Sequence, residues 1–89
     1  MSTFDEKWAT LLRTMLKYYD HPRLGSGVTM GFDSPRDRQR ALGRLEDMGF
    51  RPQQVFATRI YVSWNKNARL FTEPAMERAR TALKELEER

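Results

Sequence analysis

The chain has 89 residues, no cysteine and a formal net charge of +4 at pH 7. That length predicts one domain spanning 1–89, and the lack of cysteine excludes disulfides, thiolate metal sites and a thiol nucleophile. No apolar run approaches the roughly 18 residues of a membrane-spanning helix, and the N-terminus lacks the order of a signal peptide, so we expect a soluble cytoplasmic protein without membrane contact.

The positive charge is concentrated in the middle of the chain. Residues 34–69 hold eight basic and three acidic side chains, a net charge of +5. Residues 1–33 sum to zero and residues 70–89 to −1. A locally basic segment favours an anionic partner, either an acidic protein surface or a nucleic acid.

The first predicted element is a helix that begins after Thr3 and ends near Tyr19. Thr3 followed by Glu6 fits a capping box. A helical repeat of 3.6 residues gathers the apolar side chains on one face, namely Phe4, Trp8, Leu11, Leu12, Met15, Leu16, Tyr18 and Tyr19. We therefore expect a core helix in which Trp8→Ala is among the most destabilising substitutions.

Residues 20–27 form a predicted loop that leads into a strand. Pro22 cannot continue the first helix, and Gly25 and Gly27 free the backbone. Residues 28–32 then alternate large apolar side chains with smaller or polar ones. This alternation is typical of a strand with one buried face.

A second helix is predicted over 35–48, with a marked beginning and end. Ser34 is placed to cap it, and Pro35 occupies its first position. Gly49 is the expected left-handed residue after the last turn, and the apolar Phe50 is expected to fold back on that turn. Both ends are therefore fixed by local residue types.

Residues 55–64 are predicted to form the main strand, because they are rich in β-branched and aromatic side chains. The even-numbered apolar residues share one face, which we expect to be the core face: Phe56, Ile60, Val62 and Trp64. The odd-numbered face carries Arg59, Tyr61 and Ser63 and is expected to be exposed.

The remainder of the chain is predicted to contain a turn, a short strand and a helix. Asn65 and Asn67 suit a turn over 65–68, after which 69–71 could pair back as a short edge strand. Thr72 is then expected to cap a last helix that runs to about Glu88.

The order of elements predicts an α+β fold of two layers: helix, strand, helix, strand, short strand, helix. We expect a small sheet of two or three strands with the helices mainly on one face, since each amphipathic helix needs an apolar partner. The open face would carry Thr29, Arg59, Tyr61 and Ser63. The second helix is long enough for a parallel crossover, and an antiparallel arrangement of the strands fits equally.

Arg36, Arg40 and Arg44 recur at every fourth residue of the second predicted helix, on the side away from its apolar residues. Like charges at this spacing cost a few tenths of a kcal/mol, which favours a binding role for the three arginines. The alternative is a solvated face partly neutralised by Asp37 and Asp47. Arg38 falls among the apolar positions, from which it either extends to solvent or reaches the edge of the sheet.

Arg59 and Tyr61 form a second candidate site on the open face, and Arg51 of the same basic segment is counted separately among the partner-binding residues. A guanidinium beside an aromatic ring is the smallest unit on which a nucleic-acid base can stack. The alternative is that Tyr61 packs against its cross-strand neighbour.

Catalytic and metal sites are not predicted. His21 is the only histidine, so a metal site would need several converging carboxylates. Ser26, within the glycine-flanked loop 25–27, has only His21 as a potential base. We therefore expect no enzymatic activity, no cofactor and no metal.

These observations predict a non-enzymatic binding protein that modulates or inhibits a larger protein or nucleoprotein complex with an acidic surface. In size and character the chain is comparable to small phage-type inhibitors of host complexes, for example complexes that handle nucleic acid in defence. The contacts are assigned to Arg36, Arg40, Arg44, Arg51, Arg59 and Tyr61. The alternative is direct nucleic-acid binding through phosphate contacts by the same arginines. A third reading is a homodimer formed through strand 69–71 or the face of Tyr61.

Overall fold

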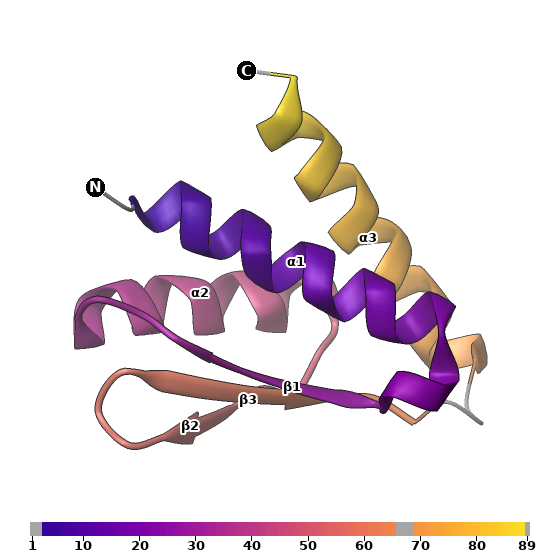
Figure 1. The fold of residues 1–89 in the computed structure, drawn as a ribbon, viewed down its shortest axis with the longest axis horizontal. Coiled ribbons are helices and arrows are strands. Elements are labelled where there is room, and N and C mark those ends of the chain that lie inside the picture. The colour runs from indigo at the N-terminus through magenta and orange to yellow at the C-terminus, as the bar shows by residue number, and fades with distance from the viewer. Residues whose placement is uncertain (1–2, 66–68, 89) are drawn as a thin grey trace.

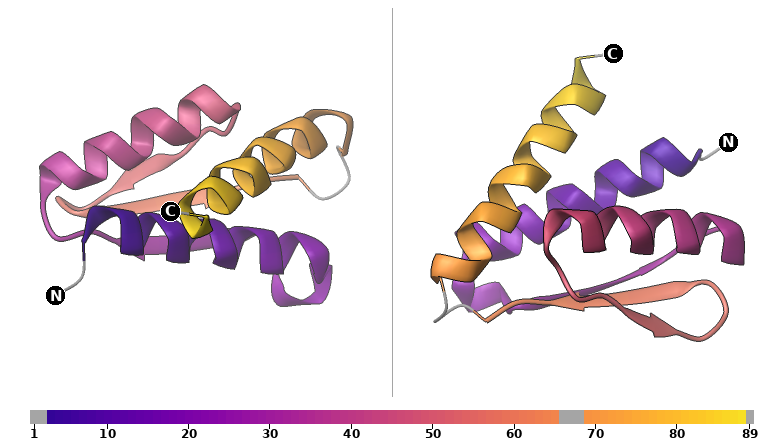
Figure 2. Two further views of the ribbon diagram at one scale, coloured as in Figure 1. Left: turned by 90° about the horizontal axis from the view of Figure 1, so that it is seen from above. Right: turned by 180° about the vertical axis from the view of Figure 1, so that it is seen from behind.

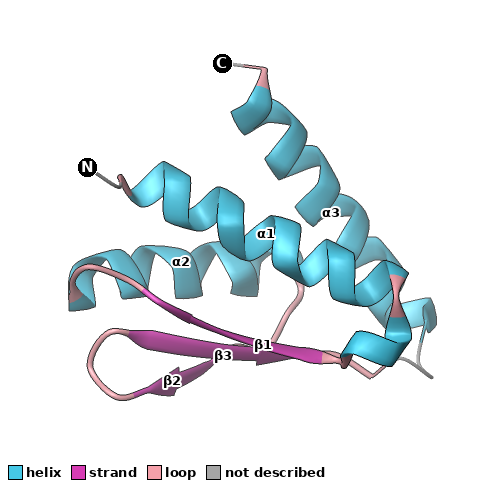
Figure 3. Ribbon diagram, viewed as in Figure 1, coloured by secondary structure: helices cyan, strands magenta, loops and turns pink. Residues whose placement is uncertain are grey.

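The computed structural model describes residues 3–65 and 69–88. Its elements in chain order are α1 (Phe4–Asp20), η1 (Pro22–Leu24), β1 (Gly27–Gly31), α2 (Pro35–Met48), β2 (Gln53–Val55), β3 (Arg59–Ser63) and α3 (Arg69–Glu87). The α-helices lie on one side of the sheet, and no described helix covers the other side (Figure 1, Figure 3). This α+β arrangement of two layers confirms the fold class predicted from the sequence.

Helix α1 begins as the capping box predicts. The Thr3 hydroxyl oxygen accepts a hydrogen bond from the backbone N–H of Glu6 at 3.2 Å. The predicted apolar face is buried at Trp8, Ala9, Leu11, Leu12, Met15, Leu16 and Tyr19, while Phe4 and Tyr18 lie partly buried at its margin. The helix therefore supplies the centre of the core.

Helix α2 has the predicted bounds and the predicted caps. The Ser34 hydroxyl accepts from the backbone N–H of Asp37 at 3.1 Å, and Pro35 occupies the first turn. Gly49 has a φ of 107°, and the N–H of Phe50 donates to the carbonyl of Leu45 at 3.0 Å. This hydrogen bond belongs to a Schellman motif, which closes the helix and buries Phe50.

The strands lie in the order β1-β3-β2, and both pairs are antiparallel. Val28 lies opposite Val62, and Met30 lies opposite Ile60. The antiparallel pairing of β1 with β3 decides between the two arrangements that the sequence left open. Figure 2 shows β3 between its two neighbours, with the helices stacked on one face only.

The predicted strand 55–64 is wrong at its beginning, because residues 56–58 form the turn of a hairpin. The third strand is therefore β2, which precedes this turn. Phe56, expected in the core, is 83% exposed instead. Ile60, Val62 and Trp64 are buried as predicted. The β-branched and aromatic residues around 56–58 resemble a continuous strand, and no glycine or asparagine marks the turn.

The predicted edge strand 69–71 is also wrong, because these residues begin α3. A strand there would have no place beside β3, since β1 and β2 already occupy both edges of that strand. Thr72 lies inside the helix, where its buried hydroxyl donates to the carbonyl of Asn65 at 3.2 Å. Three residues of the predicted turn, 66–68, lie outside the described part of the chain.

One core joins the two layers. It contains side chains from all three α-helices and from β1 and β3, with Trp8, Leu11, Leu45, Ile60 and Met76 among its fully buried members. Within the residues that the structure describes, no helix has the length and apolar character to cross a membrane.

Candidate functional site

Arg36, Arg40 and Arg44 form a stripe along α2, called here the Arg stripe. Arg36 and Arg40 are exposed, and Arg44 is half-buried. The guanidinium carbons of Arg40 and Arg44 lie 4.1 and 4.9 Å from the ring centroid of Phe4. The guanidinium of Arg44 is also 5.7 Å from the ring of Trp8. The sequence placed the stripe away from the core, whereas two of its members rest on the aromatic margin of that core.

Phe4 is itself held by two other rings. Its centroid lies 6.3 Å from that of Trp8, with the ring planes 9° apart. It lies 5.9 Å from that of Phe32, with the planes 28° apart. Cation–π contacts of this kind contribute about 0.5–1 kcal/mol at exposed sites. The stacked rings therefore give Arg40 and Arg44 a firm surface that limits the freedom of their guanidinium groups.

The Arg stripe has no carboxylate partner among the described residues, and this includes the nearby Asp37 and Asp47. Three other cations of the described chain, Lys7, Arg13 and Arg80, do have carboxylate partners. Their ion pairs are Lys7 with Asp33 at 3.3 Å, Arg13 with Glu87 at 3.5 Å, and Arg80 with Asp20 at 2.7 Å and Glu77 at 2.8 Å. The stripe is thus a set of cations whose charge is not balanced by contacts within the described protein.

Arg38 points away from the stripe and reaches the edge of the sheet, which was one of the two predicted outcomes. Its Nη1 donates to the carbonyl of Phe56 at 2.9 Å, and its Nη2 donates to Oε1 of Gln39 at 3.1 Å. Its Nε is buried and has no hydrogen-bond partner. Arg38 therefore holds the hairpin turn, a role that no local sequence pattern indicates.

The open sheet face, formed by Thr29, Arg59, Tyr61 and Ser63, is exposed as predicted. Tyr61 lies directly opposite Thr29 on β1, and its hydroxyl end lies over Gly27. A Cβ atom at Gly27 would stand 2.6 Å from Oη of Tyr61. The Arg59 side chain lies over Gly31 in the same manner, with its Cγ 3.7 Å from a Cβ built there. Gly27 thus allows Tyr61 to lie across the sheet, whereas the contact of Arg59 with Gly31 would leave room for a Cβ.

The predicted site residues do not converge on one surface. The Arg stripe belongs to the helix layer and leans toward α1. Arg59 and Tyr61 alternate with the buried Ile60 and Val62 along β3, so they lie on the opposite side of the sheet from the core. Arg51 borders a third region. It lines a surface pocket of about 440 Å³ together with Phe50, Ser63, Trp64 and Thr72, among others. A partner that contacts all six predicted residues would have to wrap around the domain.

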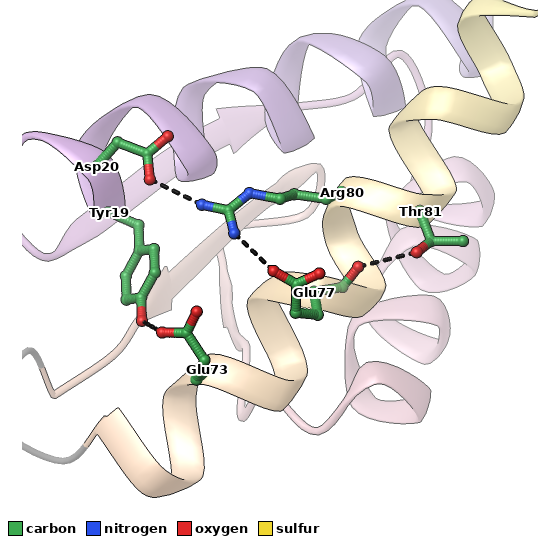
Figure 4. A network of polar contacts seen from close by, with 6 residues as sticks. All are labelled: Tyr19, Asp20, Glu73, Glu77, Arg80 and Thr81. Atoms are coloured by element: carbon green, nitrogen blue, oxygen red, sulfur yellow. Dashed lines mark hydrogen bonds and ion pairs between the residues drawn. The ribbon is translucent and has the colours of Figure 1, made fainter.

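A polar network missed by the sequence analysis joins α1 to α3 (Figure 4). The hydroxyl of Tyr19 donates to Glu73, and Arg80 bridges Asp20 and Glu77. Burial lowers the pKa of the Arg80 guanidinium, but the hydrogen bonds and charges of Glu77 and Asp20 outweigh burial and raise that pKa above its usual value. Arg80 is therefore firmly charged, and the network attaches α3 to α1.

The residues considered for metal binding and catalysis are His21 and Ser26. Among residues 3–65 and 69–88, no three His, Asp or Glu side chains lie close enough together to hold a metal ion. His21 lies beside Asp20 in a shallow surface pocket that also includes Leu24. The backbone carbonyl of Ser26 accepts from the N–H of Trp64 at 3.0 Å, which extends the pairing of β1 with β3.

Comparisons with models of protein families, with the curated proteins and with the solved structures found no match. The function is therefore inferred from the residues described above.

Proposed function

We propose that this chain is a non-enzymatic binding protein that modulates or inhibits a larger macromolecular complex. It docks the Arg stripe against a carboxylate-rich protein surface. The observation that best supports this function is that the three arginines of one helix face have no described carboxylate partner, although Asp37 and Asp47 lie on the same helix. An unpaired guanidinium forms charge-assisted hydrogen bonds with a partner without first breaking an internal ion pair.

The stacking of Arg40 on Phe4 supports the same function. A free arginine side chain loses rotamer freedom when it is immobilised in an interface, at a cost of about 0.5–1.5 kcal/mol. Contact with the ring at 4.1 Å already restricts Arg40 in the free protein. The stripe is in this sense prepared for binding, and arginine is a residue type enriched at the energetic centres of interfaces.

Charge reversal tests this function. The wild-type protein, the Arg40→Glu variant and the Lys17→Glu variant serve as baits in nuclease-treated extract of cells that carry the gene. Lys17 is exposed on α1 and undergoes the same change of charge, so it is the matched control. We expect a partner that Lys17→Glu retains and that Arg40→Glu binds at least about tenfold more weakly. Equal binding by all three proteins would exclude the stripe from the interface.

Direct nucleic-acid binding is a second candidate, favoured by the way Arg59 and Tyr61 lie across the open sheet face. Fluorescence anisotropy with single- and double-stranded oligonucleotides tests it between about 50 and 300 mM salt. If three phosphates contact the Arg stripe, log affinity falls with log salt at a slope of about −3. The Arg36/Arg40/Arg44→Gln variant should lose most of that slope. No binding at low salt would leave the protein surface as the ligand of the stripe.

A further inference from the structure

The hairpin turn between β2 and β3 presents a phenylalanine in an unfavourable setting. Phe56 is 83% exposed, and it is the one described non-glycine residue with a positive φ, at 59°. The left-handed backbone region strains a residue that carries a Cβ, and glycine or asparagine occupies it at lower cost. Neither the strain nor the exposed ring stabilises the fold, and such strain is typical of functional sites.

Side chains of α2 and β2 hold this turn in place. The guanidinium of Arg38 donates to the carbonyl of Phe56, and Oε1 of Gln39 accepts from both Arg38 and Gln54, each at 3.1 Å. The Nε atom of Arg38 is buried without a hydrogen-bond partner, which lowers the free energy of unfolding. The contacts of Arg38 with the turn therefore come with a loss of stability. The ring is therefore presented from a fixed backbone, which reduces the entropy lost on binding.

The charges around the hairpin indicate the chemistry of what it contacts. The sequence contains no aspartate or glutamate between Asp47 and Glu73, so β2, β3 and their turn carry no carboxylate. Arg59 follows the turn and is exposed on the open sheet face. An exposed aromatic side chain, with an exposed arginine three positions later in the same hairpin, fits an apolar pocket with carboxylates at its rim.

We propose that Phe56 is the anchor of a protein–protein contact, in which its ring enters an apolar pocket of the partner and Arg59 meets a carboxylate at the rim. A nucleic acid fits less well, because the guanidinium of Arg38, the cation that contacts the turn, is engaged by Phe56 and Gln39. This inference rests on the proposed function only in requiring a protein partner. It uses residues outside the Arg stripe, although the hairpin turn and the first turn of α2 lie at the same end of the molecule (Figure 1).

The first test needs only the protein itself. Phe56→Asn removes the ring but keeps a residue that tolerates the left-handed backbone. We expect its thermal midpoint to be no lower than that of the wild type, since no core packing is lost. A clear fall of the midpoint would show that the ring is a structural element, and the proposal would be overturned.

The second test measures binding with a defined probe, a displayed library of protein fragments from the genome that carries the gene. Fragments are selected on the wild-type protein alone, and the affinity of each selected fragment is then measured for the wild type and for the variants. For the selected fragments we expect at least tenfold weaker binding to Phe56→Asn and unchanged binding to Leu24→Asn, which removes another apolar side chain, 50% exposed, from the surface. Crosslinks from a photoreactive phenylalanine analogue at position 56 should map to an apolar site flanked by carboxylates.

The outcomes separate this proposal from the proposed function. The anchor is overturned if no fragment distinguishes the wild type from Phe56→Asn, or if oligonucleotides rather than fragments lose affinity for Phe56→Asn. If a selected fragment binds Phe56→Asn but not Arg40→Glu, the Arg stripe is the docking site and the anchor role of Phe56 is overturned. If a selected fragment binds Arg40→Glu but not Phe56→Asn, Phe56 is the anchor and the Arg stripe is excluded from the contact.

Discussion

Gly27 lies beneath the hydroxyl end of Tyr61, and this close approach explains a glycine at a position where a strand prefers a larger residue. A Cβ at Gly27 would stand 2.6 Å from Oη and 3.0 Å from two ring carbons of Tyr61. At Gly31 the nearest atom, Cγ of Arg59, is an ordinary 3.7 Å away. The conformation of Tyr61 on the open sheet face therefore depends on Gly27 and not on Gly31.

Alanine substitution tests this dependence. Alanine in place of a strand glycine raises the free energy of unfolding by about 0.5–1 kcal/mol, which is the gain expected for Gly31→Ala. Gly27→Ala should force the Tyr61 ring to move, and this clash should cost about 1 kcal/mol relative to Gly31→Ala. In a Tyr61→Ala background this cost should vanish, because the clashing ring is gone. Urea denaturation of the four proteins gives the coupling. An unchanged cost in the Tyr61→Ala background would contradict the contact.

Helix α2 offers two glycines whose replacement should have opposite effects. Gly43 lies inside the helix, and a Cβ there would meet nothing within 4 Å. Gly49 has a φ of 107°, and a Cβ there would lie 3.4 Å from Nη1 of Arg78, which donates to the carbonyl of Met48. Gly43 therefore destabilises the helix, whereas Gly49 is needed for the left-handed residue that ends it.

We expect Gly43→Ala to raise the free energy of unfolding by about 0.5–1 kcal/mol, because alanine restricts the unfolded chain and favours the helix. Gly49→Ala should lower it by about 1–2 kcal/mol, because the left-handed backbone is strained with a Cβ. Thermal unfolding followed by circular dichroism measures both. Two changes of the same sign would mean that the Schellman motif does not control the end of α2.

The elements that the sequence predicted well are those whose limits are fixed by adjacent residues. The caps of α1 and α2 involve hydrogen bonds between neighbours three to five positions apart, so Thr3, Ser34 and Gly49 reveal them directly. The hairpin turn has no such local signal, because its residues favour a strand and its hydrogen bond with Arg38 spans 18 positions. Contacts of that range leave no periodic pattern in the sequence.

The candidate site likewise combines features that follow from the local sequence with features that depend on how the elements pack. The spacing of the Arg stripe and the exposure of Arg59 and Tyr61 follow from helical and strand periodicity, and both are found in the structure. The stacking of Arg40 and Arg44 on Phe4 joins α2 to α1 and could not be foreseen from either helix alone. The separation of stripe and sheet face likewise follows from packing, because it depends on the side of the sheet to which α2 is attached.

At the scale of the whole molecule, the two tryptophans report on opposite regions of a single core. Trp8, 2% exposed, lies beside Phe4 and Arg44 near the beginning of α1. Trp64 is buried just after β3, in the region where α3 begins. Trp8→Ala should cost about 3–5 kcal/mol, a large share of the total stability of about 5–15 kcal/mol expected for a small domain.

Because one continuous core contains both rings and the Arg80 network attaches α3 to α1, we expect the domain to unfold in a single cooperative transition. The Trp64→Phe variant reports on Trp8 alone, and the Trp8→Phe variant reports on Trp64 alone, while phenylalanine keeps most of the buried apolar area. Within each variant, the urea midpoint from tryptophan fluorescence should coincide with the midpoint from far-ultraviolet circular dichroism. A fluorescence transition of Trp64 that precedes the loss of helix would contradict this expectation, since it would mean that the end formed by β3 and α3 opens as a separate unit.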